Sequence, residues 1–527
     1  MSKIFIYDTT LRDGTQGEGV SLSVEDKVKI TKRLDEFGID YIEGGWPGSN
    51  PKDAEFFQRV RSMPMSHARI AAFGSTRRGK LKAEDDPNLC ALVESGVSVA
   101  TIFGKSWDLH VMHALNVPLE QNIEMIYDSV EFLKKHVPEV FFDAEHFFDG
   151  YKAYPEYSIK ALKAAAAAGA DCLALCDTNG GSLPSEIALI IAEVRKHIDV
   201  PLGIHAHNDC ELAVANSVTG VQSGAIQVQG TINGYGERCG NANLCTVIPV
   251  LQMKMGLDCI PPGSLEQLTQ MSNYVDEVAN VVPNDRQPFV GRSAFAHKAG
   301  VHVDAMMKDN RTYEHVRPEV VGNERRVLIS ELAGASSIAH KAEAFGIDLG
   351  KKSPETAEVL QKIAELENNG FSFEGADASF ELLIQKSMGT YKKLFDMKSF
   401  HVNVSRRGTD LESITEAILR MVVDGEEMLT VAEGDGPVHA MDHALRKALE
   451  KFYPEELRHI KLTDFKVRVL NPKDATAAGV RVVVESTDGT SSWTTVGVST
   501  NIIEASWHAL VDSVEYGLLK WQNREGA

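Results

Sequence analysis

"KIFIYDTTLRDGTQGEGVSLSVEDKVKITKRLDEFGIDYIEGG" (residues 3–45) has the pattern of one complete strand–helix–strand unit, which is the building block of α/β folds. Its ends, KIFIYD and IDYIEGG, are runs of β-branched and aromatic residues that are typical of strands. Ser23 and Asp26 form a capping-box pattern before the intervening helix, and Gly38 is a typical helix end. The apolar residues between these signals recur at helical spacing, on a stripe formed by Val24, Val28, Thr31, Leu34 and Phe37.

The same unit recurs along the first 250 residues. Six further strand-like runs alternate with helical stretches, in the order RIAAFG, VSVATIF, EVFFDAE, DCLALCD, PLGIHAH and AIQVQGT. Eight strands with intervening helices over about 250 residues predict a closed (β/α)₈ TIM barrel, which we assign to residues 1–270. An open doubly wound sheet is the competing α/β fold, but it often has a G-x-G-x-x-G turn, which is absent after the first strand here.

The rest of the chain does not continue this regular alternation of strand-like and helical runs. Residues 271–398 are polar and predict a helical linker region, whereas residues 399–527 predict an α+β domain. VHAMDHAL (438–445) and IEASWHAL (503–510) share an alanine and a His-Ala-Leu triplet, and each follows strand-like runs. These matches predict an internal β–β–α repeat within the C-terminal domain, although a repeat this short can also arise by chance.

Composition restricts the class of protein. There are 54 basic and 74 acidic residues, and the net charge of −20 argues against binding to nucleic acid or to an anionic membrane. No apolar run approaches the ~18 residues of a membrane span, and no basic leader segment precedes the first strand, so we expect a cytoplasmic protein. The seven cysteines include no C-x-x-C pair, which predicts reduced thiols, with Cys172 and Cys176 buried on one strand.

Several polar residues coincide with the predicted carboxyl ends of strands, where barrel enzymes carry their chemistry. Asp13 follows the first strand, His205 and His207 share one side of the seventh, and Asn241 lies among glycines after the eighth. One carboxylate, two imidazoles and an amide oxygen predict a catalytic divalent ion such as Mg²⁺, Mn²⁺, Co²⁺ or Zn²⁺. The alternatives are two polar rim histidines and an aspartate that caps a helix or pairs with Arg12.

Arg12 stands directly before the predicted metal ligand Asp13. A divalent ion that binds an α-keto acid would polarise its carbonyl, and a neighbouring guanidinium could stabilise the oxyanion formed when a carbon nucleophile attacks. A surface ion pair between the two residues would contribute less than about 1 kcal/mol and would not explain the glycines around them. We therefore predict that Arg12 faces the developing negative charge.

The motifs DTTLRDGTQ, HAHND, GERCGNANL and WTTVGVSTNIIEASWHAL together resemble the isopropylmalate, homocitrate and citramalate synthases, and more distantly 3-hydroxy-3-methylglutaryl-CoA lyase. The resemblance covers nearly the whole chain. It implies a divalent metal held by Asp13, His205 and His207 with Asn241 in or near the shell, and acetyl-CoA as co-substrate. By the same resemblance, Arg12 polarises the keto oxygen.

The resemblance also implies roles for three further rim residues. Thr178 in CDTNG corresponds to the threonine that hydrogen-bonds the keto-acid carboxylate, and Gln16 lies in the first substrate-binding loop. Glu145 in FDAEHF corresponds to an acidic residue that assists the acetyl-CoA half-reaction. The alternative for Glu145 is an ion pair with Arg12.

The segment AFAHKAGVHVDAMMKDNRTYEH resembles the part of these synthases that reaches the active site of the partner subunit, which implies a homodimer. His302 corresponds to the general base that deprotonates the acetyl methyl group, since an imidazole titrates near neutral pH. Tyr313 would assist it, with Asp304 and Asn310 around the coenzyme. Because His297 and His315 lie nearby, the assignment of Tyr313 is less specific than that of His302.

The implied reaction is a Claisen-type condensation of acetyl-CoA with an α-keto acid, followed by thioester hydrolysis. The segment with Trp46 and Pro47, together with IFGKSWDLH, resembles the citramalate synthases more than the isopropylmalate synthases. This resemblance implies pyruvate as acceptor, giving citramalate on a route to isoleucine, and isoleucine as effector of a regulatory C-terminal domain. The alternative acceptor is 2-oxoisovalerate, which would give 2-isopropylmalate, with leucine as effector. A hydroxyacyl-CoA lyase and a non-catalytic amino-acid sensor are the alternatives from other classes.

Overall fold

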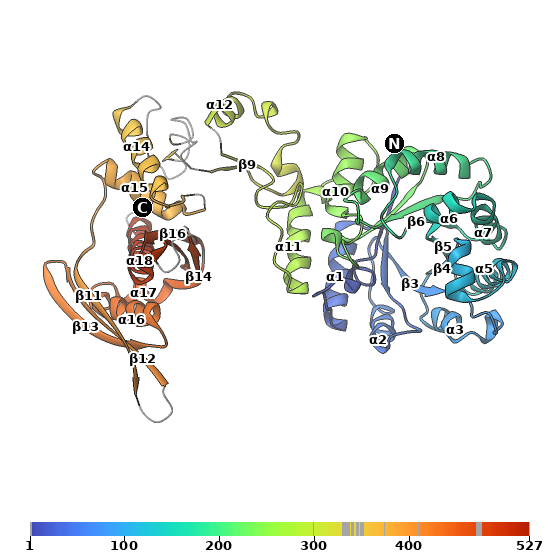
Figure 1. Cartoon of the computed structure of the whole chain (residues 1–527), viewed down its shortest axis with the longest axis horizontal. Helices are drawn as coiled ribbons and strands as arrows, with labels where there is room; N and C mark the ends of the chain where they lie inside the picture. The colour runs from blue at the N-terminus through green and yellow to red at the C-terminus, as the bar shows by residue number, and fades with distance from the viewer. Residues whose placement is uncertain are drawn as a thin grey trace. The chain divides into compact units, whose positions relative to one another are not determined.

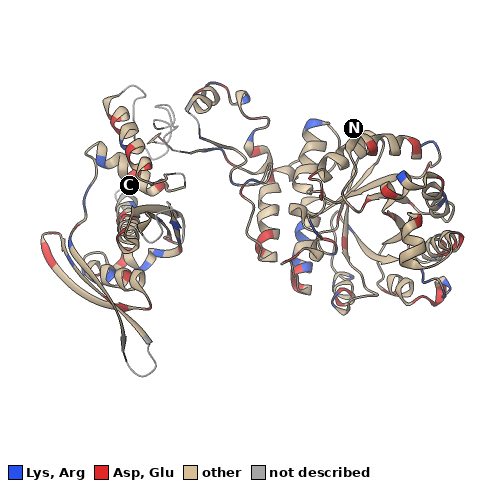
Figure 2. Ribbon diagram, in the orientation of Figure 1, with Lys and Arg blue, Asp and Glu red and all other residues tan. Residues whose placement is uncertain are grey.

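The computed structural model describes residues 3–298, 300–328, 338, 342–343, 347, 353–373, 375–407, 412–470 and 477–525. The chain divides into two compact units. The first contains Met1–Phe295 and Val316–Glu324, and the second contains Ala296–His315 and Arg325–Ala527. Among the described residues, no helix is both long and apolar enough to cross a membrane. Acidic and basic residues are interspersed along the sequence of both units (Figure 2).

The first unit is built around a closed barrel of eight strands that pair in chain order (Figure 1). Its strands are β1 (Phe5–Asp8), β2 (Tyr41–Gly45), β3 (Arg69–Ser75), β4 (Val99–Lys105), β5 (Glu139–Glu145), β6 (Cys172–Asp177), β7 (Leu202–Ala206) and β8 (Gln227–Gly230). All are parallel, and β1 closes the barrel against β8, with Tyr7 opposite Gln229. The eight strands and the TIM-barrel fold predicted from the sequence are confirmed.

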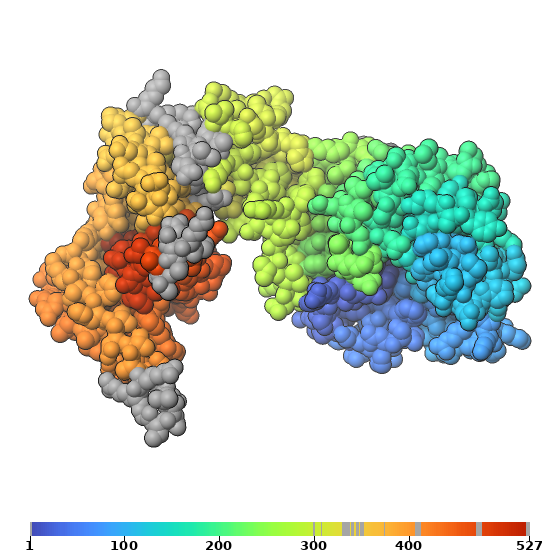
Figure 3. Space-filling model, viewed as in Figure 1, coloured from blue at the N-terminus to red at the C-terminus, as the bar shows by residue number. Residues whose placement is uncertain are grey.

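Helices follow the strands and form the outer layer of this unit (Figure 1). Figure 3 shows one face of the molecule with all atoms drawn. The helices are α1 (Val24–Phe37), α2 (Pro51–Val60), α3 (Pro87–Glu94), α4 (Asp108–His110), α5 (Leu119–Lys134), α6 (Phe147–Ala153), α7 (Pro155–Ala167), α8 (Pro184–Val194), α9 (Ala213–Gln222), α10 (Leu244–Pro249) and α11 (Leu268–Ala279). The capping box of α1 is present, because Ser23 accepts from the Asp26 amide and Asp26 accepts from the Ser23 amide. The helix ends at Gly38, whose φ of 93° favours glycine.

The barrel interior is filled at its amino-terminal end and polar at its carboxyl end. Tyr7, Tyr41 and Phe141 pack together at the amino-terminal end, with ring centroids 5.1–6.2 Å apart. Cys172 belongs to the same cluster, and Cys176 is buried further along β6. The seven cysteines all lie in the described residues and are all free thiols. The prediction of two buried cysteines on one strand is confirmed.

The second unit begins with β9 (Ala296–His297), α12 (Gly300–Lys308) and β10 (Arg326–Val327), followed by α14 (Pro354–Asn368) and α15 (Asp377–Ser387). Two three-stranded antiparallel sheets follow. The first contains β11 (Phe395–Arg407), β12 (Glu412–Val423) and β13 (Glu426–Gly434) and is followed by α16 (Pro437–Leu449) and α17 (Pro454–His459). The second contains β14 (Lys461–Val469), β15 (Val480–Thr487) and β16 (Ser492–Ser499) and is followed by α18 (Ile502–Glu525).

The predicted internal repeat is present, but each unit is β–β–β–α rather than β–β–α. The first strand of each repeat, β11 or β14, is an edge strand with several charged residues, so its hydrophobic alternation is weak and the sequence does not show that it belongs to the repeat. Each repeat contains an equivalent hydrogen bond between its third strand and its helix. The Thr430 hydroxyl donates to the Ala444 carbonyl in the first repeat, and the Thr495 hydroxyl donates to the Ala509 carbonyl in the second. Since these alanines are the middle residues of the two His-Ala-Leu triplets, the sequence match marks equivalent helix–sheet contacts.

Candidate active site

The carboxyl ends of all eight strands surround one cavity of about 230 Å³. Seven of the predicted site residues line it: Arg12, Asp13, Gln16, Glu145, Thr178, His205 and His207. Trp46, which the sequence analysis connects with the choice of acceptor, also lines it. The remaining lining residues were not singled out as site residues from the sequence: Phe73, Phe103, Asp143, Cys176, Glu237 and Arg238. The period-two pattern of strands could have indicated Asp143, which lies two residues before Glu145 on β5 and therefore faces the same side.

Asp13, His205 and His207 form a compact and buried triad. Their ligand atoms all lie within 4.8 Å of one another, with His205 Nε2 3.2 Å from His207 Nε2 and 3.4 Å from Asp13 Oδ2. Burial raises the pKa of Asp13, but the charges of Arg12 and of the two imidazoles outweigh this effect and lower it overall. Burial and the neighbouring His205 lower the pKa of His207 to about 3. The triad therefore presents one carboxylate and a neutral His207 at neutral pH.

Asn241 completes the donor set from the loop after β8. It pairs with His207 in an isolated bridge, and its Nδ2 donates to the Tyr235 carbonyl at 3.1 Å. Its Oδ1 is buried and has no hydrogen-bond partner among the described residues. Asn241 does not line the 230 Å³ cavity, but its unpartnered oxygen adds to the two imidazole nitrogens and the carboxylate of the triad a fourth donor of the mixed N/O kind that binds divalent cations. The residues present therefore fit a divalent metal ion.

Arg12 is held beside the triad by a carboxylate that we did not identify from the sequence. Its Nε lies 2.9 Å from Glu43 Oε2 and its Nη2 3.4 Å from Glu43 Oε1. Glu43 also accepts from Tyr7 and Thr9, and the guanidinium stacks over the Phe73 ring at 3.7 Å. Because Glu43 and the ring fix the guanidinium, its Nη1 lies only 3.5 Å from Asp13 Oδ1.

Glu145 does not pair with Arg12, so that alternative is wrong. Its carboxylate forms an ion pair with Lys105, which is the last residue of the neighbouring strand β4. Strand register explains this choice, because Lys105 lies directly opposite Glu145 in the β4–β5 ladder. The Thr178 hydroxyl oxygen accepts from the His146 amide at 2.9 Å, which leaves its hydrogen available for a bound ligand.

The four remaining predicted residues belong to the second unit. His302 and Tyr313 are both exposed, and their rings stack at a centroid distance of 4.2 Å. Asp304 lies on α12 and pairs with Lys308 at 2.6 Å, and Asn310 follows the helix. The structure thus brings the predicted base and its predicted assisting tyrosine together.

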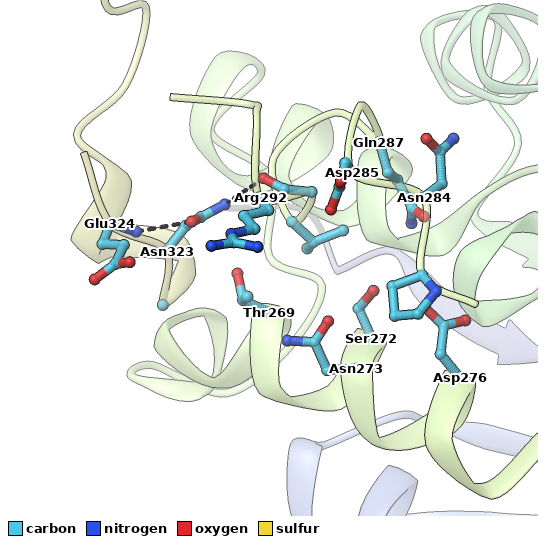
Figure 4. A pocket seen from close by; sticks show the side chains of 14 residues that line it. Thr269, Ser272, Asn273, Asp276, Asn284, Asp285, Gln287, Arg292, Asn323 and Glu324 are labelled. Carbon is cyan, nitrogen blue, oxygen red and sulfur yellow. Dashed lines mark hydrogen bonds between the residues drawn. The ribbon is translucent and has the colours of Figure 1, made fainter. Parts of the chain in front are cut away.

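A larger cavity, of about 510 Å³, lies between α11 and the chain segments around residues 285 and 323 (Figure 4). Several of its polar side chains hold the wall together: Thr269 donates to the Val321 carbonyl, and Asn323 donates to two backbone carbonyls. Asp276 accepts from Asn233 and from Tyr235, whose carbonyl in turn holds Asn241. This wall therefore supports the loop that carries Asn241.

Three family models match consecutive parts of the chain. The HMGL-like model matches residues 3–275, the homocitrate synthase post-HMGL domain-like model residues 289–370, and the LeuA allosteric (dimerisation) domain residues 374–518. The chain belongs to the HMGL-like family, whose model matches the barrel and its rim.

Full-length relatives define the group more narrowly. The chain is 57% identical to an (R)-citramalate synthase of Geobacter sulfurreducens, with both chains covered completely, and 54% identical to that of Aquifex aeolicus over 98% of each chain. It is 31% identical to a 2-isopropylmalate synthase of Methanocaldococcus jannaschii over 98% of this chain and 95% of that protein. The family resemblance inferred from the sequence is confirmed, and the citramalate synthases are clearly the nearer group.

Proposed function

We propose that this protein condenses acetyl-CoA with pyruvate and water to give (R)-citramalate and CoA. The observation that carries the proposal is the buried triad of Asp13, His205 and His207 with the Arg12 guanidinium fixed beside it. The full-length similarity to (R)-citramalate synthases supports the same substrates. We assign the barrel, residues 1–270, to catalysis, residues 271–398 to the linker that carries the base, and residues 399–527 to regulation.

A divalent ion held by the triad and Asn241 would supply Lewis-acid polarisation of the keto group. The Thr178 hydroxyl hydrogen donates to the carboxylate of the keto acid, while Gln16 lines the same cavity. The Arg12 guanidinium faces the keto oxygen, on which negative charge develops. Its hydrogen bond to Glu43 holds the guanidinium in this position. These contacts bind the acceptor at two ends and orient its carbonyl carbon.

The other half of the reaction is assigned to Glu145 and to the residues of the second unit, contributed by the partner subunit of a homodimer. His302 removes a proton from the acetyl methyl group, with Tyr313 stacked against the imidazole and Asp304 and Asn310 near the coenzyme. The resulting carbon nucleophile forms the new carbon–carbon bond, and the keto oxygen takes up a proton. Water then cleaves the thioester, which releases a carboxylate and CoA.

The test is a screen of acceptors with the full-length protein. Pyruvate, 2-oxobutyrate, 2-oxoisovalerate and 2-oxoglutarate are each incubated with acetyl-CoA and Mn²⁺, thiol release is followed, and products are identified by chiral chromatography with mass spectrometry. We expect pyruvate to give the highest kcat/KM and (R)-citramalate as product. A preference for 2-oxoisovalerate would replace the proposal with a 2-isopropylmalate synthase.

An aromatic wall explains why a small acceptor is favoured. Trp46 packs edge-on against Phe73 and Phe103, with centroid distances of 5.8 and 5.7 Å. The indole Nε1 donates to Asn88, and the Trp46 amide donates to Asp53 at 2.9 Å, so the wall is held from behind. Because the wall borders the cavity, we infer that it limits the size of the side chain that the acceptor can carry.

We expect Phe103→Ala to raise the kcat/KM ratio of 2-oxoisovalerate to pyruvate by at least about tenfold, since each methyl-sized change in a pocket alters specificity by about 1–3 kcal/mol. Steady-state kinetics with both acceptors measures this ratio. Phe141→Ala is the matched control, because this ring lies inside the barrel but in the cluster at its amino-terminal end. An unchanged ratio in a folded Phe103→Ala protein would show that the wall does not select the acceptor.

The C-terminal domain supports the assignment of a homodimer. One face of the first sheet packs on α16 through Ala417, Leu419 and Met421 of β12. The opposite face exposes apolar residues, including Ile418 and its cross-strand partner Val431, and Leu429, which is 59% exposed. This surface suits dimer formation, and we assign an amino-acid effector, isoleucine, to the same domain.

Leu429→Asp is expected to raise the dimer dissociation constant at least about 30-fold, the effect of losing a central contact worth about 2 kcal/mol. Sedimentation velocity over a concentration series measures this constant. Glu450→Lys is the control, since Glu450 is exposed at the end of α16, on the opposite side of the sheet. Unchanged association of a folded Leu429→Asp protein would place the dimer contact elsewhere.

A further inference from the structure

The His205 imidazole has distinct neighbours on its two nitrogens. Nε2 faces the triad, with His207 Nε2 at 3.2 Å and Asp13 Oδ2 at 3.4 Å. Nδ1 faces the other way and lies 3.0 Å from Oε1 of Gln229, a residue of β8. A neutral imidazole carries one hydrogen, so the contact at Nδ1 determines whether Nε2 offers a lone pair or a proton to the triad.

The neighbours of Gln229 fix the orientation of its amide. Its Nε2 lies 3.0 Å from Asp143 Oδ1 and 3.4 Å from Gln227 Oε1, and both of these atoms are acceptors. If the amide were flipped, its oxygen would face these two oxygens and its NH₂ group would face the imidazole. The observed orientation places Oε1 against His205 Nδ1, which must therefore carry the hydrogen and donate it.

Burial protects this chain of hydrogen bonds from solvent. Gln229, Asp143 and His205 are 1%, 4% and 5% exposed, on three different strands of the barrel. Burial and the charge of Glu43 raise the pKa of Asp143 to about 7. Protonation of Asp143 does not reverse the hydrogen bonds from His205 to Gln229 and from Gln229 to Asp143, because a proton on Asp143 Oδ2 still leaves Oδ1 free to accept from Gln229.

We propose that Asp143 and Gln229 are positioning residues that act through His205: Asp143 orients the Gln229 amide, and Gln229 holds the imidazole as the Nδ1–H tautomer with the Nε2 lone pair directed at the metal. The proposal rests on the metal site of the proposed function. Among the described residues, Nδ1 of His207 has no such hydrogen-bond partner, so this support is specific to one of the two histidines. Partners of this kind raise ligand basicity and fix ring orientation.

The first test measures Mn²⁺ binding to full-length, metal-stripped protein by isothermal titration calorimetry, without substrates. Gln229→Leu is expected to weaken Mn²⁺ binding by about 10–100-fold, the usual effect of losing such a partner. Gln227→Leu is the matched control, because Gln227 is also buried on β8, two residues away, but contacts Gln229 rather than His205. We expect Gln227→Leu to retain most of the parent affinity.

The second test exchanges the carboxylate of Asp143 and the amide of Gln229 while keeping both side chains at their original size. Gln229→Glu alone places a second carboxylate against Asp143 and is expected to weaken Mn²⁺ binding. Asp143→Asn combined with Gln229→Glu restores a donor facing an acceptor, with a carboxylate still accepting from His205, and is expected to recover most of the affinity. This recovery is not expected of a merely space-filling role. The two Glu-containing variants decide the question if Gln229→Leu does not fold.

Two results would overturn the positioning role. One is parent-like Mn²⁺ affinity in folded Gln229→Leu protein, and the other is a double variant that binds no better than Gln229→Glu alone. Failure of the parent protein itself to bind Mn²⁺ would instead overturn the metal site. The two proposals therefore fail in distinguishable ways.

Discussion

His207→Ala is expected to lower Mn²⁺-dependent release of CoA from acetyl-CoA and pyruvate by about a thousandfold. Lewis-acid polarisation contributes several kcal/mol, and each 1.4 kcal/mol corresponds to a tenfold change in rate. His207 Nε2 faces His205 Nε2 at 3.2 Å and burial keeps the imidazole neutral, so the substitution removes one of the predicted ligand atoms from the triad. Thiol release with and without added Mn²⁺ measures the effect.

The matched control is His197→Ala. His197 lies just before the same strand, β7, at its amino-terminal end, and its partner is Glu193 at 3.8 Å. Its removal should leave turnover and its dependence on metal unchanged. Parent-like turnover of folded His207→Ala protein would contradict the assigned metal site, and Asp13→Ala provides an independent repeat because it removes the carboxylate of the same triad.

Arg12→Lys is expected to lower kcat by about 10²–10³-fold, the usual effect of removing one donor from an oxyanion site. Lysine keeps the charge but cannot hold two Glu43 oxygens and stack flat on Phe73 at the same time. The lysine ammonium should therefore occupy a different position, where its positive charge no longer faces the keto oxygen. The KM for pyruvate should change much less than kcat, because the interaction strengthens as the oxyanion forms.

Arg69→Lys is a close control for this substitution. Arg69 also pairs with a strand glutamate, Glu139, and lies 4.4 Å from the ring of Tyr41, but it sits at the amino-terminal end of the barrel. Its replacement should affect thermal stability more than turnover. If both variants lose activity equally, the effect of Arg12→Lys would reflect stability, and the role given to Arg12 would be wrong.

Most of the fold was predictable because strands and helices impose different periods on the sequence. The eight buried strands are short apolar runs separated by amphipathic helices, and this pattern identified every barrel strand. The C-terminal repeat was predicted with one strand too few in each unit, because charged residues in the edge strands β11 and β14 weaken the alternation that would assign them to the repeat. The helix–sheet contacts at Ala444 and Ala509 were nevertheless marked by the repeated triplet.

The chemical groups at the barrel rim follow from the order of residues alone, because strand ends and period-two spacing place Asp13, His205 and His207 on one edge. The order of residues did not determine how those groups pair. Arg12 binds Glu43, Glu145 binds Lys105, and His205 is oriented by Gln229. These partners lie on different strands, and only barrel closure and strand register bring them within hydrogen-bond distance. Orientation and charge at the site are therefore properties of the tertiary structure.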